Sequence, residues 1–416
     1  MAIDNKDKKV LKSSIEREQN EVACSAECEK IKGSKNLNVP HLRFPEFSGE
    51  WEIYPLTDFM SFKNGMNPDA KRFGRGTKFI SVMDILNNQF ICYDNIRASV
   101  EVVDGDIETY GVNYGDILFQ RSSETLEDVG QANVYLDSKP AVFGGFVIRG
   151  KSKSNYYPMF FRYLLASPTA RKKIIVKGAG AQHFNIGQDG LSKVCLNIPS
   201  IQEQEKIAKL FECIDTRIAT QNKIIEDLKK LKSAISLKML HSDSWEQFKI
   251  QDIASIGRGR VISSVEISQQ ENPLYPVYSS QTSNDGIMGY LDDFMFEGEY
   301  ISWTTDGANA GTVFYRNGKF NCTNVCGLLK LKKGFDAHFV SLVLAEATRM
   351  YVSTNLANPK LMNNTMGNIQ IRLPKLEEQK RISVVFRKLH GLLETHNSLI
   401  IKYSKQKQYL LSQMFI

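Results

Sequence analysis

The sequence predicts a mixed α/β protein in which two globular segments alternate with two long helices. Three observations support this fold class. Two stretches of the chain resemble each other, each half ends in a sustained heptad strip, and the segments between the strips hold short β-branched and aromatic runs. The length of 416 residues agrees with two to four domains at about 100–200 residues per domain.

The internal repeat is visible at three places. Residues 198–207 recur as residues 373–382, an offset of 175. Upstream, residues 51–59 resemble 245–253 at an offset of 194, and residues 115–119 resemble 298–302 at an offset of 183. The shrinking offset indicates one architecture used twice, with deletions inside the second copy.

Each half ends in a heptad strip, in which the spacing alternates between four and three residues. The first strip holds Ile207, Phe211, Ile214, Ile218, Gln221, Ile225, Leu228, Lys232, Ile235 and Met239. The second holds Ile382, Phe386, Leu389, Leu393, His396, Ile400, Tyr403, Lys407, Leu410 and Met414. Ser200 and Glu203 form a predicted capping box at the first helix start, and Lys375 is a weaker cap at the second.

Two interpretations of these strips remain open. Either helix could pack its apolar strip on its own globular segment. Alternatively, the two helices pair with each other, which the length of the strips favours. The polar positions Gln221 and His396 also favour pairing, because polar residues at core positions fix the register of coiled coils.

The segments 39–197 and 243–371 predict two globular domains, followed by helices within 198–242 and 372–416. Strands are expected at 78–82, 117–120, 142–148, 300–304, 312–315 and 328–331, and short helices at 157–166 and 337–348. Residues 1–38 are rich in both charges and nearly free of aromatic residues, which predicts a flexible tail.

Composition excludes several classes of protein. The apolar fraction is 42% and the charged fraction 24%, as in ordinary globular proteins. No apolar stretch approaches the roughly 18 residues of a membrane helix, and the charged start is unlike a secretory signal. The seven cysteines include two C-x3-C pairs, which we interpret as thiols of a reducing compartment rather than zinc ligands.

The sequence offers no motif for catalysis or for a cofactor. It has no G-x-x-x-x-G-K-[ST] phosphate loop, no H-E-x-x-H pair and no N-P-P-[FY] tetrapeptide. A nuclease carboxylate cluster would have to combine Asp69 with Glu378, which are far apart in the chain. We therefore expect no catalytic residue, metal or cofactor, and keep a single-chain nuclease or methyltransferase as a contrasting hypothesis.

Polar loops next to the predicted strands supply residues suited to nucleic acid. Arginine can bond guanine, asparagine and glutamine can bond adenine, and lysine, serine and threonine commonly contact phosphates. In the first half the candidate DNA-contacting residues are Lys71, Arg72, Arg75, Lys78, Gln120, Arg121, Ser122, Ser123, Lys177, Gln182, His183 and Asn185. In the second half they are Arg258, Arg260, Trp303, Thr304, Thr305, Asn309, Asn324, Asn358, Lys360 and Asn363. Any one of them is more simply a solvated loop residue, but similar positions with different residues suit two readers of two sites.

From residue 39 onward the chain resembles the specificity subunit of type I restriction–modification systems. The resemblance rests on Pro40-His41-Leu42-Arg43-Phe44-Pro45-Glu46-Phe47 followed by Trp51, and on the motif that begins Gly115-Asp116. It rests above all on the paired helix starts at 198–204 and 373–379. Residues 300–307 also resemble the target-recognition domains of that family.

The resemblance implies a non-catalytic, pseudo-two-fold molecule whose two helices form an antiparallel coiled coil. Each target-recognition domain would read one half of a bipartite site in double-stranded DNA. The helices would act as a spacer ruler and would dock two methyltransferase subunits, with two endonuclease–translocase subunits outside. It also implies a cytoplasmic protein without a membrane partner. The alternatives are a coiled-coil scaffold with two ligand-binding modules and the specificity protein of a related bipartite-site system.

The net charge of +7 lies mostly outside the expected DNA-reading domains. Residues 202–240 hold 8 Lys and Arg against 6 Asp and Glu, and residues 375–416 hold 8 against 3. The two globular segments together have one more acidic than basic residue. Since backbone affinity for DNA grows with the number of phosphates neutralised, the isolated chain is expected to bind DNA weakly.

Overall fold

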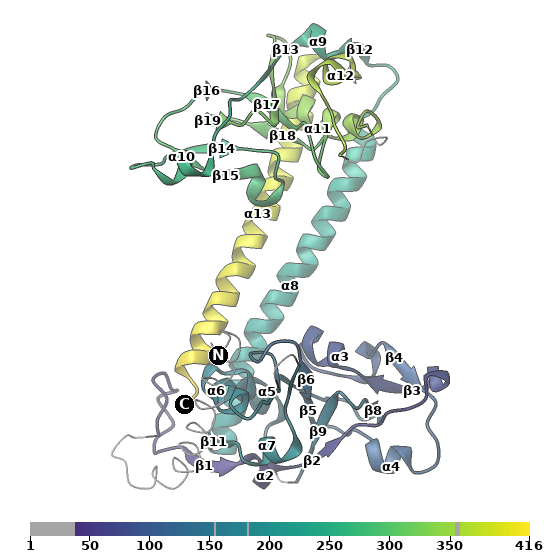
Figure 1. Ribbon diagram of the computed structural model, residues 1–416, viewed down its shortest axis with the longest axis vertical. Coiled ribbons are helices and arrows are strands. Elements are labelled where there is room, and N and C mark those ends of the chain that lie inside the picture. Colours follow the sequence, from purple (N-terminus) through teal and green to yellow (C-terminus); the bar gives the residue numbers. More distant parts are fainter. Residues whose placement is uncertain (1–37, 154, 181–182, 354–357) are drawn as a thin grey trace, which may run out of the picture. The chain divides into compact units, whose positions relative to one another are not determined.

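The computed structural model describes residues 38–153, 155–180, 183–353 and 358–416 and divides into two compact units. The first unit comprises Met1–Gln221 and Leu399–Ile416, and the second comprises Asn222–Ser398. Each unit therefore combines one globular part with segments of both long helices (Figure 1). The predicted tail lies outside the described residues, except for Asn38.

The first unit is built on three main sheets. A pair joins β1 (Glu52–Pro55) to β11 (Cys195–Ile198). A four-stranded sheet has the order β2 (Met60–Asn64), β9 (Val147–Ser152), β5 (Ile117–Gln120), β7 (Ala132–Val134), and a three-stranded sheet the order β4 (Ala98–Val100), β3 (Phe73–Ile80), β8 (Val142–Phe143). The helices include α2 (Leu56–Phe59), α3 (Val82–Asn87), α4 (Asp106–Tyr110), α5 (Pro158–Ala166), α6 (Pro168–Ile175) and α7 (Gln188–Ser192).

The second unit repeats this plan. β12 (Glu246–Lys249) pairs with β21 (Gln370–Leu373). The four-stranded sheets have the orders β13 (Ala254–Arg258), β20 (Cys326–Leu331), β17 (Tyr300–Thr304), β18 (Val313–Arg316) and β15 (Ile287–Leu291), β14 (Tyr275–Tyr278), β19 (Lys319–Cys322), β16 (Phe296–Glu297). The helices include α9 (Ile250–Ile253), α10 (Ser264–Ser268), α11 (Ala337–Ala347) and α12 (Asn363–Asn368).

Strand registers show how closely the two units match. Glu52 lies opposite Ile198, and its repeat partner Glu246 lies opposite Leu373, as the sequence offsets require. In the central sheet the registers align Phe119 with Trp303, an offset of 184. The offset of 183 from the sequence is therefore wrong by one residue along this strand. A one-residue slip matters because it exchanges the two faces of a strand.

Most predicted elements are present with shifted ends. The strands at 117–120 and 300–304 are found as predicted, and α5 and α11 match the predicted short helices to within one residue. The stretch 142–148 is two strands, β8 and β9, because Gly145 and Phe146 form a turn between them that the Gly144 carbonyl closes by accepting a 2.9 Å hydrogen bond from Val147. The strand predicted at 78–82 ends at Ile80, since Ser81 and Asp84 form a capping box that starts α3.

The long helices are α8 (Ile201–Met239) and α13 (Leu376–Gln413). Every position of both heptad strips is buried or partly buried. In the first unit the start of α8 (Ile207, Phe211, Ile214) packs in one core with Leu410 near the end of α13. In the second unit the end of α8 packs with Ile382 and Phe386 at the start of α13 (Figure 1). The helices therefore pair antiparallel, and their paired ends also pack into the globular cores.

A half-buried ion pair reinforces the helix contact in the first unit. The ammonium of Lys407 on α13 lies 2.6 Å from the carboxylate of Asp215 on α8, which also accepts a 2.9 Å hydrogen bond from the Tyr163 hydroxyl. Burial, and next the charge of Asp215, raises the pKa of that hydroxyl. Lys407, one of the polar interruptions of the second heptad strip, thus has a partner on α8.

The capping box predicted at the start of α8 forms only in half. The Ser200 hydroxyl accepts a hydrogen bond of 3.4 Å from the backbone N–H of Glu203. The Glu203 carboxylate instead accepts hydrogen bonds from Arg43 and from the Trp51 indole. A tertiary contact therefore replaces the reciprocal bond that the sequence pattern predicted.

Within the described ranges, no helix is long and apolar enough to cross a membrane. Over the same residues, no group of three or more His, Cys, Asp or Glu side chains is arranged to hold a metal ion.

Candidate nucleic-acid interface

In the first unit, strand pairing brings several predicted residues together at the end of β5. The strand β6 (Ser122–Ser123) pairs antiparallel with β10 (Phe184–Asn185). The Ser122 hydroxyl donates to the Asn185 side chain, and the backbone of Arg121 accepts a hydrogen bond of 2.9 Å from Ile186. Arg121 and Ser122 therefore form one polar edge with Asn185, which lies 63 positions after Ser122 in the sequence. We call this group the first-unit polar edge.

An apolar hollow of about 380 Å³ lies beside the first-unit polar edge. Its lining includes Phe146, which is 69% exposed, and Phe73 and Met83, which are also exposed. The backbone N–H of Arg121 donates to the carbonyl of Phe146 over 2.8 Å, which links the hollow to the edge. Sequence reasoning missed Phe146. The sequence offered one signal for this position, the Gly144-Gly145 pair just before it. In the structure a Cβ at Gly145 would lie 2.0 Å from the side chain of Asn67, so the chain needs glycine there.

The basic residues predicted around β3 mostly have partners inside the unit. Arg72 pairs with Asp106, and Arg75 with Glu101 at 2.8 Å. The Lys78 ammonium donates to the carbonyl of Ile96 over 2.7 Å. Lys71 is exposed and has no ion-pair partner among the described residues.

The other predicted residues of the first unit are spread out. Gln120 is buried, with its amide nitrogen bonded to the carbonyl of Ser122. Its amide oxygen has no partner among the described residues. His183 is exposed and Lys177 partly exposed, whereas Gln182 lies outside the described residues.

In the second unit, Arg258 is held against another of the predicted residues. It ends β13, and its guanidinium donates to the Asn363 side chain over 2.9 Å. A second group gathers around Asp306, which accepts a hydrogen bond from Asn358 and forms an isolated backbone bridge with Lys360. These residues come from strands and loops up to 105 positions apart.

Burial removes three predicted residues from the surface of the second unit. Trp303, Thr304 and Thr305 are at most 2% exposed. The Trp303 indole donates to the carbonyl of Leu361 over 2.9 Å, and the Thr305 hydroxyl donates to the carbonyl of Val325 over 2.9 Å. These side chains hold the loops in place, and we do not retain them as proposed DNA contacts.

The remaining predicted residues of the second unit stay at its surface. Asn309 and Asn324 are exposed, while Arg260 is paired with Glu266. Asn324 lies in the loop 323–325, which occupies the same place between β19 and β20 that 144–146 occupies between β8 and β9. The matching loops thus present asparagine in one unit and phenylalanine in the other.

The Gly115-Asp116 motif has a structural role in the first unit. Gly115 has a φ of +89°, which favours glycine. The Asp116 carboxylate accepts hydrogen bonds of 3.0 and 3.1 Å from the backbone N–H groups of Asn113 and Ser152. Burial raises the pKa of Asp116 and lowers the pKa of the neighbouring Arg149. The motif therefore fixes β5 against β9.

Comparison with known proteins identifies the architecture. The family model of the type I restriction modification DNA specificity domain matches residues 48–230 and again 242–402. The chain belongs to this family. It is a type I specificity subunit with two DNA specificity domains, the non-catalytic component that acts with DNA and the other subunits of a restriction–modification complex.

Similar proteins support the assignment. A Mycoplasma pneumoniae protein named as a type I specificity subunit (S.MpnORF201P) is 35% identical over 233 residues, 54% of this chain and 97% of that protein. The type I restriction enzyme MpnII specificity subunit of the same organism is 41% identical over 177 residues, covering 41% of this chain and 53% of that one.

Solved structures share the fold of this specificity subunit. The S subunit of a type I system from M. genitalium aligns with a TM-score of 0.63 at 15% identity, over 91% of this chain and 99% of that one. A structure on the assembly of a type I system aligns with a TM-score of 0.53 at 12% identity, over 89% and 98%.

Proposed function

We propose that the globular part of each unit reads one half of a bipartite site in double-stranded DNA. In the first unit the contacts come from the first-unit polar edge and Phe146. In the second unit they come from Arg258, Asn363, Asn324 and the group around Asp306. Arginine and asparagine supply hydrogen bonds to base edges, and Phe146 suits an apolar contact such as a thymine methyl group.

One observation carries this proposal. The central four-stranded sheets of the two units share strand order and register, yet their matching loops hold different residues: 144–146 is Gly-Gly-Phe, whereas 323–325 is Thr-Asn-Val. A common scaffold with different loops is what two readers of different sequences require. A single catalytic site would instead need one set of residues gathered at one place.

The paired helices are proposed to set the spacing between the two half-sites and to dock partners. In the second unit they expose apolar side chains, namely Leu231 and Leu237 on α8 and Val384 and Leu392 on α13. These side chains suit two methyltransferase subunits, with two endonuclease–translocase subunits joining outside them. We place the complex in the cytoplasm, where it meets DNA.

Domain exchange tests the two-reader proposal. Residues 39–197 are replaced by the matching domain of another specificity subunit, and methylated sites are mapped in cells that carry the partner subunits. We expect one half of the methylated sequence to change and the other half to stay. A change in both halves, or in neither, would contradict the proposal.

A helix insertion tests the ruler separately. Four residues added after Leu228 add about one helical turn, or about 5–6 Å. The methylated site should gain spacer length with both half-sites intact. An unchanged spacer in a folded, active complex would show that the helices do not set it. Co-purification of a methyltransferase subunit distinguishes this function from a scaffold for peptides or sugars.

A further inference from the structure

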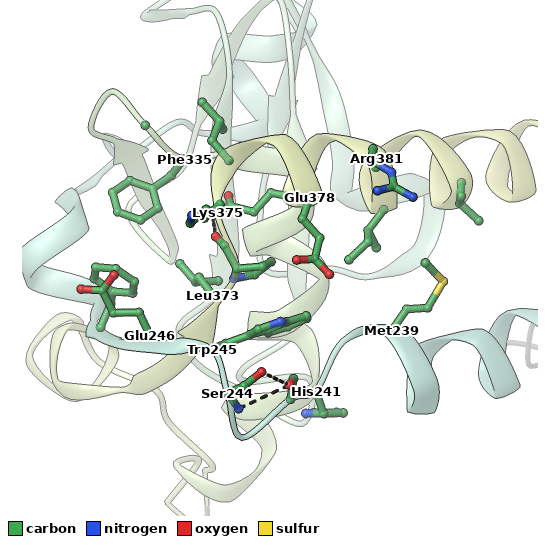
Figure 2. A pocket seen from close by; sticks show the side chains of 18 of the residues that line it. Met239, His241, Ser244, Trp245, Glu246, Phe335, Leu373, Lys375, Glu378 and Arg381 are labelled. Atoms are coloured by element: carbon green, nitrogen blue, oxygen red, sulfur yellow. Dashed lines mark hydrogen bonds between the residues drawn. The ribbon is translucent and has the colours of Figure 1, made fainter.

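Each unit contains a pocket at the start of a long helix, and the two pockets are built from matching residues. In the first unit Trp51, Pro199 and Glu203 line a hollow of about 330 Å³. In the second unit their repeat partners Trp245, Pro374 and Glu378 line a pocket of about 950 Å³ (Figure 2). The scaffold beneath them is equivalent, because Gln204 and Gln379 both donate to the carbonyl of the preceding proline, at 3.0 and 2.8 Å.

A segment of the same chain, residues 40–47, packs over the first pocket, and its Arg43 and Phe47 line the hollow that remains. Arg43 of this segment donates to both carboxylate oxygens of Glu203, at 2.8 and 2.7 Å. The next residue, Phe44, lies beneath the Lys206 ammonium, 4.8 Å from the ring centroid, and Glu46 forms an ion pair with the same lysine. The arginine, the aromatic ring and the acid thus each have a partner on the first turns of α8.

The second pocket keeps the receiving residues, but among the described residues no comparable segment covers it. The chain reaches Trp245 directly from the end of α8, through only five residues. Glu378 matches Glu203, and Arg381 matches Lys206, at the same positions of the second helix. Both side chains are exposed, and neither forms an ion pair or side-chain hydrogen bond with any residue that the structure describes.

The two tryptophans also differ in burial, as a covered first pocket and an open second pocket would require. Trp51 is 2% exposed and its indole donates to Glu203. Trp245 packs edge-on against Phe339 much as Trp51 packs against Phe160, but it remains partly exposed. Figure 2 shows the Glu378 side chain pointing toward Trp245, with both facing the pocket. The Glu378 carboxylate and the partly exposed Trp245 therefore resemble Glu203 and Trp51 as these would be without the segment 40–47.

Two observations point to another protein as the source of an occupant for the second pocket. Each copy of this chain has one segment with the required residues and two receiving pockets, so exchange between copies would empty one pocket for each one filled. Residues 1–37 contain no aromatic residue and therefore cannot supply the ring. We infer that the Trp245 pocket binds an extended segment of a partner protein in which an arginine is followed by an aromatic residue and then, within a few positions, an acidic residue.

A peptide with the sequence of residues 38–50 is the probe, because it already carries this pattern and lacks tryptophan. A fluorescent copy is titrated with the full chain and its anisotropy measured. We expect saturable binding that weakens about 10-fold to 100-fold when the peptide carries Arg43→Ala or the chain carries Glu378→Gln, since a hydrogen bond to a charged group is lost. A peptide with Arg43→Glu should bind the Glu378→Arg chain better than the unchanged chain.

Glu377→Gln is the matched control, because Glu377 is an exposed neighbour on the same turn that does not line the pocket. It should leave peptide binding unchanged. Absence of binding at about 1 mM peptide, or equal effects of the two glutamine variants, would overturn the inference. So would binding that depends on Glu203, since the peptide would then be replacing the chain's own segment. A dimer that Glu378→Gln dissolves would identify a second copy as the occupant and would also overturn it.

Discussion

Glu203 and Glu378 occupy matching positions of the repeat, but Glu203 is buried and Glu378 is exposed. Removing the charge should therefore lower the free energy of unfolding by different amounts at the two positions. Glu203 is 1% exposed and receives two hydrogen bonds from Arg43 at 2.7 and 2.8 Å, with the Trp51 indole at 3.3 Å. These bonds also raise the pKa of Arg43. Glu378 is exposed, and within the described part of the chain it has no side-chain partner.

The magnitude follows from the burial of the pair. Removing one partner of a buried ion pair costs about 3–5 kcal/mol. The side chain of Arg43 is 13% exposed, so water can partly solvate it after Glu203→Gln, and we expect a loss near the lower limit, about 3 kcal/mol. For a unit of this size, that loss should lower the melting temperature of the first unit by about 6–12 °C. Glu378→Gln should change stability by less than about 0.5 kcal/mol.

Thermal and urea unfolding of the full-length variants measure this difference. Near-ultraviolet signals from Trp51 and from the second-unit tryptophans separate the transitions of the two units. Equal losses for the two variants, or a loss below about 1 kcal/mol for Glu203→Gln, would refute the argument that the segment 40–47 is held by a buried ion pair.

Four further predictions concern stability and DNA recognition. Phe211→Ala should destabilise the first unit by about 3–5 kcal/mol in urea unfolding, because this fully buried ring packs against both the globular core and the end of α13. Burial, and next the charge of Arg387, lowers the pKa of His338 to about 4. Its unfolded pKa is about 6.5, so the shift alone corresponds to about 3.4 kcal/mol, lost as pH falls from about 6.5 to about 4. Because the ring is only partly buried, solvent screening should reduce this loss to about 2 kcal/mol, and His338→Gln should flatten the slope. Gly259→Ala should prevent normal folding of the second unit, seen as lost amide protection, since its Cβ would lie 1.6 Å from the carbonyl oxygen of Cys322. Phe146→Ala should alter methylation at one half-site while leaving the melting temperature within about 2 °C, because the ring is 69% exposed; equal loss at both half-sites would contradict its assignment to one reader.

The sequence by itself determined the repeat, the two long helices and their buried strips. The helices and their strips follow from local periodicity, because a heptad pattern places apolar residues along one face of a helix, and that face is buried whichever element packs against it. The strands at 117–120 and 300–304 were equally readable, since continuous β-branched and aromatic runs specify buried strands. The family resemblance followed from the same repeated motifs.

Tertiary structure alone decided which polar residues face solvent. Trp303, Thr304 and Thr305 resembled a base-reading loop in the sequence, but they are buried because β17 lies inside its sheet. Phe146 fell within the predicted strand 142–148 and is instead exposed, because it lies in the turn between β8 and β9. The hydrogen-bond partner of the Glu203 carboxylate was also decided by a residue far away in the chain. Its pattern predicted a helix cap, but Arg43, 160 residues away in the chain, supplies a charged hydrogen bond that a backbone N–H cannot match.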